Sequence, residues 1–233
     1  MTRRLAGFAL AVLLAFAAAA PAAGAPVAGA QFRFWDFSDD ETMRDVLAYV
    51  APGPFHVQLE YWDFERGEDQ FRPEVGVHMR DRRRSSYTAQ WRHERDAERW
   101  WLETEQVVGE RWTVRGAVSP IVRPHDTVVV YEAGADVYWH SYSFAGAGVI
   151  RDPREGGLWV FPMRARLANE ANDWLQLTVA PASRRTIGWA VDAKWRIVRA
   201  GVERNSRYDF TTRDNVIFTA GLEVPLPQPA AKD

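Results

Sequence analysis

Apolar and polar residues alternate with a period of two along most of the chain. Near the start of this pattern, Phe55, Val57 and Leu59 are separated by polar residues. Successive residues of a β-strand face opposite sides, so each such segment predicts a strand with one apolar and one polar face. The pattern recurs about twelve times in residues 55–226, at the length that a tilted membrane strand needs. Short polar turns separate the segments, which predicts a single all-β domain, an antiparallel up-and-down β-barrel.

A different period precedes this region. Met43 and Leu47 lie at helical spacing after Ser38, which is a favourable N-cap residue. The Pro-Gly-Pro sequence at residues 52–54 would end a helix. We therefore predict that residues 31–54 form an N-terminal segment with one short amphipathic helix. This helix either caps a mouth of the barrel or belongs to a loosely packed leader.

The first residues have the layout of a secretory signal. Two basic residues are followed by an apolar run at residues 5–20 and then by small residues and prolines. Two A-x-A cleavage sequences follow. The one that ends at Ala25 would put Pro26 directly after the cut, which a peptidase handles badly. We therefore predict cleavage after Ala30 and a signal peptide of residues 1–30.

Composition narrows the fold class further. The chain has no cysteine, so an exported form must be held by burial, by a closed hydrogen-bond network or by lipid. Its net charge of -2 implies no broad attraction to nucleic acid. No second stretch is long enough for a membrane helix, and only helices and closed barrels satisfy the backbone in lipid. The mature chain is therefore either a soluble barrel or a membrane barrel.

The positions of the tryptophans favour the membrane barrel. The chain contains 11 tryptophans, and five of them fall on apolar faces near predicted strand ends. Amphipathic aromatic rings prefer the two membrane–water interfaces, where they form girdles around a barrel. The predicted interface aromatics are Trp91, Trp100, Trp112, Trp159 and Trp195.

The polar faces carry charges of both signs, which would line the lumen of a membrane barrel and pair there. The predicted lumen-lining residues are Glu60, Glu74, His78, Arg92, Glu103, Glu105, Arg115, Glu132, Asp136, Arg164, Arg166, Asp192, Lys194, Arg199 and Glu203. Glu103 and Glu105 share one face of their strand, and so do Arg164 and Arg166. We predict that these residues form salt bridges across the lumen with residues of opposite charge.

Most of the mature chain, and especially residues 186–226, resembles the YaiO-like outer-membrane β-barrel family. The resemblance is carried by the strand at residues 188–195, the Arg-Tyr-Asp turn at 207–209 and the closing strand at 215–222. The segment is also similar to the barrel ends of exopolysaccharide export porins. These resemblances imply an outer-membrane barrel, a link to envelope polysaccharide export and no catalytic residues. The chain departs from the pattern in its C-terminal tail, residues 227–233, because outer-membrane barrels usually end on an aromatic residue.

Few residues indicate other chemistry. His56 and His78, with Glu60 and Glu74 on neighbouring strands, have the side chains of a metal site, but the prediction is a polar lumen network without metal. His140 and Ser141 are adjacent and would face opposite sides of a strand, so they cannot form a nucleophile–base pair. We find no nucleotide-binding loop and predict no cofactor. The basic turn at residues 81–84 predicts either contact with lipid phosphate or a solvated loop.

The leading functional prediction is a non-enzymatic bacterial outer-membrane barrel, either a narrow passage or a structural and assembly component. Its expected partners are outer-membrane lipid, lipopolysaccharide and the barrel assembly machinery. The first alternative is an exported soluble β-barrel that binds a small ligand. The second is an envelope lipid hydrolase.

Overall fold

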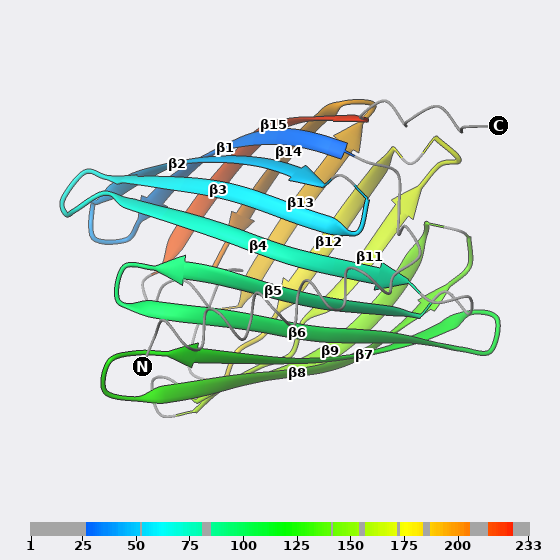
Figure 1. Cartoon of the computed structure of the whole chain (residues 1–233). Helices are drawn as coiled ribbons and strands as arrows, with labels where there is room; N and C mark the ends of the chain where they lie inside the picture. The colour runs from blue at the N-terminus through cyan, green and yellow to red at the C-terminus, as the bar shows by residue number, and fades with distance from the viewer. Residues whose placement is uncertain are drawn as a thin grey trace, which may run out of the picture.

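The computed structural model describes residues 27–51, 53–80, 85–140, 142–153, 157–171, 173–183, 187–205 and 214–225. Regular structure in these ranges consists of fifteen β-strands (Figure 1). The strands are β1 (Val27–Phe37), β2 (Thr42–Ala51), β3 (Phe55–Phe64), β4 (Gln70–Arg80), β5 (Ser86–Glu94), β6 (Ala97–Val108), β7 (Trp112–Val122), β8 (Thr127–Tyr138), β9 (Phe144–Asp152), β10 (Leu158–Val160), β11 (Met163–Ala168), β12 (Trp174–Ala180), β13 (Gly188–Trp195), β14 (Val198–Arg204) and β15 (Asn215–Pro225). Within the described ranges, no helix has the length and apolarity needed to cross a membrane.

The strands form one closed antiparallel barrel. Chain neighbours pair with each other around the wall, and β15 returns to pair with β1 along its whole length. β10 and β11 both pair with β9 and share one position in the wall, because the strand is interrupted at Phe161 and Pro162. In the described part of the chain, the fifteen strands therefore occupy fourteen positions. The predicted up-and-down meander is correct, but the predicted number of about twelve strands is too low.

The two additional strands are β1 and β2, so the predicted N-terminal helix is wrong. Met43 and Leu47 point inward and are buried, whereas Val46 and Val50 are exposed on the outer face. Positions separated by four residues lie on one face in a helix and also in a strand, so Met43 and Leu47 fitted both structures. β2 has the strand conformation because β1 and β3 satisfy its backbone hydrogen bonds on both sides. Removing the residues before Gly53 would delete two wall strands and would not simply unblock a mouth.

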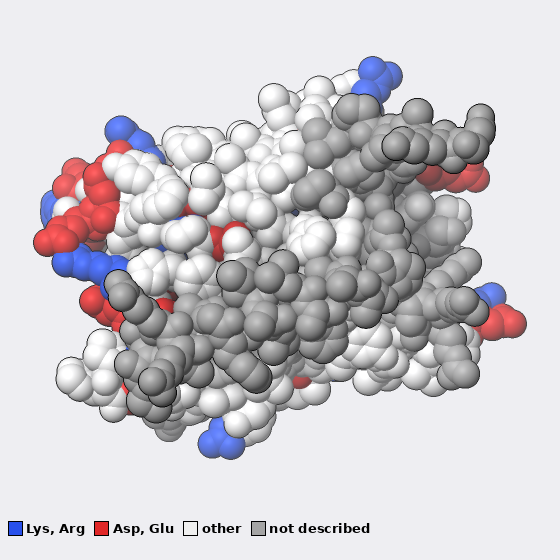
Figure 2. All heavy atoms as spheres, viewed as in Figure 1, with Lys and Arg blue, Asp and Glu red and all other residues white. Residues whose placement is uncertain are grey.

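The wall is apolar outside and mainly polar inside. Large hydrophobic side chains are exposed around the outer face, for example Leu102 (48%), Leu177 (51%) and Phe218 (52%). Figure 2 shows charged side chains mainly at the left end of the visible face and a few at the right end, whereas the described wall between them is largely uncharged. A soluble barrel would place its apolar face inside, so this architecture is that of a membrane-spanning barrel. It agrees with the predicted location in a bacterial outer membrane.

The barrel has two distinct rims. Val27 and Pro225 lie at the same end, which we call the terminal rim, with turns at residues 52–54 and 196–197 among others. The opposite end, which we call the far rim, carries the turn at residues 38–41, the end of β14 and the start of β15, among others, and lies at the left of Figure 1. The lumen runs from the terminal rim to the far rim, so the position of a residue along it can be given by the nearer rim.

Several predicted segments fall outside the described residues. They are the first 26 residues of the predicted signal peptide, the basic turn at 81–84 and the C-terminal tail at 227–233. The last four residues of the predicted signal peptide, 27–30, are described and belong to β1.

Two adjacent residues in the middle of β6 can test which side chains of the wall face lipid and which face the lumen. Leu102 is on the outer face and Glu103 points toward the lumen. An arginine on the lipid face near the bilayer midplane costs roughly 2–4 kcal/mol. Leu102→Arg is therefore expected to lower the amount of folded protein in outer-membrane fractions, measured by heat-modifiable gel mobility. Glu103→Arg is the matched control and is expected to assemble. Equal assembly of the two variants would contradict the facing.

The start of β1 predicts where the mature protein begins. Val27 to Ala30 pair with residues of β15 on one side and of β2 on the other. Cleavage after Ala30 would remove these pairs from the closing seam. We therefore expect the mature N-terminus before Val27, determined by N-terminal sequencing or intact mass of protein extracted from outer membranes. A mature chain that starts at Gln31 would show that β1 can lose its first residues.

Candidate functional site

The barrel lumen is the candidate site, because the strands direct the predicted polar residues into it. All fifteen predicted lumen residues occupy inward-facing positions of their strands. They do not form one mixed network. Most of them separate into two ion-paired networks and a third group in which two arginines lack carboxylate partners.

The first ion-pair network covers β1 to β5. Its members are Arg33, Asp45, His56, Glu60, Arg72, Glu74, Arg92 and Glu94. Arg33 lies between Asp45 and Glu60 and pairs with both. The Arg92 guanidinium pairs with Glu74 through Nη2 and Oε2 at 2.5 Å. These charges are largely removed from water, so pairing is what makes their burial tolerable.

Sequence reasoning missed half of this network. Arg33 and Asp45 were overlooked because β1 and β2 were read as a leader and a helix. Arg72 and Glu94 stand near strand ends, outside the alternating segments that were recognised. Arg72 pairs with Glu94, and its guanidinium carbon lies 4.0 Å from the centre of the Trp62 ring.

The second ion-pair network joins β7, β8 and β11. Arg115 pairs with Glu132 at 2.7 Å and with Asp136 at 3.0 Å. Arg164 donates two hydrogen bonds to Asp136, from Nη2 to Oδ2 at 2.7 Å and from Nε to Oδ1 at 3.2 Å. This two-pronged arrangement is a strong geometry for an arginine–carboxylate pair. Asp136 therefore anchors two cations in one place.

Glycines make room for the second network. A Cβ at Gly134 would lie 2.7 Å from Arg115 Nη2, and one at Gly146 would lie 1.8 Å from Asp136 Oδ1. Real Cβ atoms do not approach other atoms so closely. A side chain at either position would displace the charged groups, so the glycine-rich stretch around β9 serves the network. The same glycines explain why apolar and polar residues alternate less clearly in this stretch than in the other strands.

The third group lies on β11 to β15 and includes a stacked set of rings and guanidiniums. The guanidinium carbons of Arg166 and Arg199 lie 4.4 and 5.5 Å from the centre of the Trp174 ring. Lys194 is the cross-strand partner of both Trp174 and Arg199, and it pairs with Glu223 at 2.5 Å.

Of the four residues expected to form salt bridges across the lumen, only Arg164 does so in the described part of the chain. Arg164 and Arg166 share a face, but only Arg164 reaches a carboxylate, while Arg166 donates a hydrogen bond from Nε to Gln176 at 2.9 Å. Glu103 accepts a hydrogen bond from Trp101 Nε1 at 2.7 Å, and Glu105 accepts one from Ser86 at 3.3 Å. The expected salt bridges of Glu103, Glu105 and Arg166 are therefore wrong for the described part of the chain, because nearer uncharged partners satisfy these groups.

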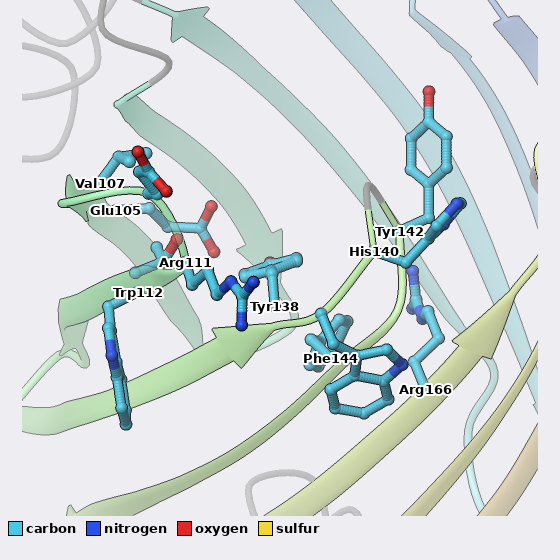
Figure 3. Close-up of a pocket in the computed structure, with 12 residues that line it drawn as sticks. Glu105, Val107, Arg111, Trp112, Tyr138, His140, Tyr142, Phe144 and Arg166 are labelled. Atoms are coloured by element: carbon cyan, nitrogen blue, oxygen red, sulfur yellow. The ribbon is translucent and has the colours of Figure 1, made fainter.

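Two cavities open into the polar part of the lumen. One of about 460 Å³ lies near the terminal rim and is lined by Glu105, Arg111, Tyr138, Phe144 and Arg166, among others. Figure 3 shows Glu105 and Arg111 on one side of this cavity and Arg166 on the other. The second, of about 340 Å³, lies between β1, β3, β5 and β14.

The far half of the lumen contains two apolar clusters beside buried polar groups such as Arg72 and Arg99. One cluster contains Trp35, Phe37, Met43, Trp62, Phe64 and Ile217. The other contains Ala97, Ile121, Val130, Ile150, Leu158, Val160, Ala180 and Ala182. The first cluster is centred on β1 and β2 and the second on β8 and β9, about half of the fourteen positions apart around the wall. Sequence reasoning did not anticipate this zone, since inward positions were expected to be polar throughout.

All five predicted interface tryptophans lie on the outer face. Trp91 and Trp100 are cross-strand partners and stand nearer the far rim, as does Trp159. Trp112 begins β7 and Trp195 ends β13, so both stand at the terminal rim. Their placement in two bands is the arrangement expected of aromatic girdles.

Two of the described histidines contact polar side chains on neighbouring strands. His56 Nε2 lies 3.3 Å from Glu74, and His78 Nδ1 lies 2.9 Å from the Thr88 hydroxyl. No group of three or more possible metal ligands occurs in the described part of the chain. Ser141, considered with His140, is outside the described residues.

One turn at the terminal rim contains Asp173, a carboxyl group whose pKa is lowered by its hydrogen bonds. The backbone N–H of Arg196 donates to Asp173 Oδ1 at 2.5 Å, and the Asn169 side chain donates to Oδ2 at 3.2 Å. These hydrogen bonds favour the carboxylate and lower the pKa of Asp173 from its ordinary value. They tie two neighbouring turns together.

Comparisons with known proteins identify the fold and no sequence family. No family model matches the chain, and no curated protein matches it. The outer membrane protein Omp33 of Acinetobacter baumannii is similar in structure, with a TM-score of 0.51 at 10% identity over 87% of this chain and 98% of that one. The porin KdgM, solved in complex with disordered oligogalacturonate, has a TM-score of 0.52 at 8% identity over 86% of this chain and 99% of that one. The fold is therefore that of a porin-like outer-membrane β-barrel, and the YaiO-like resemblance has no sequence match behind it.

The contribution of the second ion-pair network to the stability of the barrel can be tested at Asp136. Asp136→Asn would leave Arg115 and Arg164 without their shared carboxylate, and breaking a buried pair costs about 3–5 kcal/mol. We expect the free energy of unfolding, measured by urea titration in lipid vesicles, to fall by that order. Asp63→Asn is the control, since Asp63 and Arg44 are exposed and 4.0 Å apart. It should change stability by about 1 kcal/mol or less. A similar loss for both variants would mean that the network contributes no more than a surface pair.

Proposed function

We propose that the mature chain is a non-enzymatic outer-membrane barrel that provides a narrow passage for small hydrophilic solutes. The observation that carries this proposal is the closed wall, apolar toward lipid and charged toward a lumen with cavities. A purely structural barrel would have no need of charged, partly open space inside. The porin-like fold supports the same class of function.

The passage is narrow because side chains occupy much of the lumen. Fourteen positions give a wider wall than the twelve predicted, since barrel diameter grows with strand number. The two ion-pair networks fill opposite parts of this space, and the apolar clusters line its far half. Water and small polar solutes therefore pass along the third group of residues, where cations face the cavities.

The orientation follows from the turns. Those of the terminal rim are short, whereas the far rim includes the longest connection, residues 205–214. Outer-membrane barrels have short periplasmic turns and longer extracellular loops. The terminal rim, with the cavity of about 460 Å³ nearby, accordingly faces the periplasm, and the two apolar clusters of the lumen face outward.

Finer roles belong to the same proposal. The outer aromatic bands fit contact with outer-membrane lipid and lipopolysaccharide, and a barrel of this kind requires the barrel assembly machinery for insertion. The YaiO-like resemblance in residues 186–226 motivates a link to envelope polysaccharide export. KdgM was solved with an oligogalacturonate, so a barrel of this fold can accommodate an acidic saccharide.

Planar-bilayer recording of the mature protein tests the passage. We expect conductance steps much smaller than those of a 16-stranded porin in the same membrane. Trp35→Ala should increase the step size, because Trp35 is 1% exposed within an apolar cluster of the lumen. Trp195→Ala is the control, because Trp195 is exposed on the outer face and lines neither cavity, and it should leave the step size unchanged.

The outcomes separate the alternatives. Large porin-like steps in the unmodified protein would contradict a narrow lumen. No conductance from correctly folded protein, with none in Trp35→Ala, would contradict a passage and favour a structural role. Folding is checked in every case by heat-modifiable mobility.

A further inference from the structure

Arg166 and Arg199 differ from five other arginines of the lumen. Arg33, Arg72, Arg92, Arg115 and Arg164 all pair with carboxylates. Within the described part of the chain, Arg166 and Arg199 have no carboxylate oxygen at ion-pair distance. Their contacts are the Gln176 amide for Arg166 and aromatic rings for both. Two partly buried cations thus stand without a direct ion pair, and the carboxylates that attract them, Asp192 for Arg166 and Glu223 for Arg199, act from beyond ion-pair distance.

These cations are held in place by stacking. Trp174 contacts both guanidiniums, and Phe144 lies 5.4 Å from that of Arg166. Stacking uses the flat face of a guanidinium and leaves its N–H edge available, which is the edge that binds carboxylate or phosphate. Arg164 and Arg199 also act on Arg166 as like charges. An anion beside this group would relieve that repulsion.

Each arginine faces a different cavity. Arg166 lines the cavity of about 460 Å³ and Arg199 lines the one of about 340 Å³. The stack of Arg166, Trp174 and Arg199 therefore presents cations to both spaces. Glu105 lines the first cavity as well, so an anionic group there is directed toward the Arg166 side.

We propose that the Arg166–Trp174–Arg199 stack is a binding site for the oxyanion group of a small solute, a carboxylate or a phosphate. This inference rests on the proposed passage and specifies its substrate class. The two arginines bind the anionic group, and Trp174 is a positioning residue that holds them. Solutes with such a group enter one cavity at Arg166 and pass to the other at Arg199.

The test uses bilayer recordings of the full mature protein in chloride, with inorganic phosphate or succinate added. Both anions should reduce the chloride current in a saturable way, and a salt gradient should give a reversal potential on the anion-selective side. Arg166→Gln combined with Arg199→Gln should raise the half-blocking concentration at least tenfold. Trp174→Leu should raise it less, because both charges remain but their positions relax.

Lys194→Gln is the matched control. It removes one lumen cation at the same level of the barrel, but this cation is already paired with Glu223. It should alter the reversal potential through net charge while leaving the half-blocking concentration within about twofold. If Lys194→Gln and the arginine variants raise the half-blocking concentration equally, the block depends only on the net charge of the lumen, and the site is refuted. If the protein conducts without block by either anion, the site is refuted while the passage stands; if it does not conduct, the passage itself fails.

Discussion

Closure of β15 onto β1 is the constraint on which the rest of the barrel depends. The two strands pair continuously from Val27 opposite Pro225 to Phe37 opposite Asn215. In lipid, an unpaired strand edge leaves N–H and C=O groups without water, at several kcal/mol each. A barrel that lacks this seam would have two such edges. The first and last described strands of the chain must therefore meet before the apolar outer face can be stable in a membrane.

Closure also creates the space in which the charged residues are arranged. Once the wall is closed, polar side chains on its inner face cannot reach bulk water on every side, so they must find partners within the lumen. Asp136 and Glu60 each collect more than one arginine, and glycines beside Asp136 leave the space these contacts need. These networks narrow the lumen and rigidify it. The same contacts that make buried charge tolerable thus limit what can pass.

The lumen is divided along its axis as well as around it. The far half contains two packed apolar clusters, while the half nearer the termini contains cavities and the two arginines without carboxylate partners. An anionic solute would find its most favourable contacts beside these arginines and its barrier at the apolar clusters. Hydrophobic constrictions hinder ions by loss of water. Selectivity and gating would then reside in different parts of one lumen.

Alternation along the chain determined much of this protein: the all-β meander, twelve of the fourteen wall positions, and the inward direction of residues such as Glu60, Arg115 and Asp192. It could do so because side-chain facing in a strand depends only on the parity of sequence position. β2 was misread because spacing of four residues suits both helix and strand, and only pairing with β1 and β3 decided between them. The choice of partners was likewise tertiary. Arg164 and Arg166 are equivalent in the sequence pattern, yet only Arg164 meets Asp136, because strand register and barrel curvature decide which inward side chains come within reach.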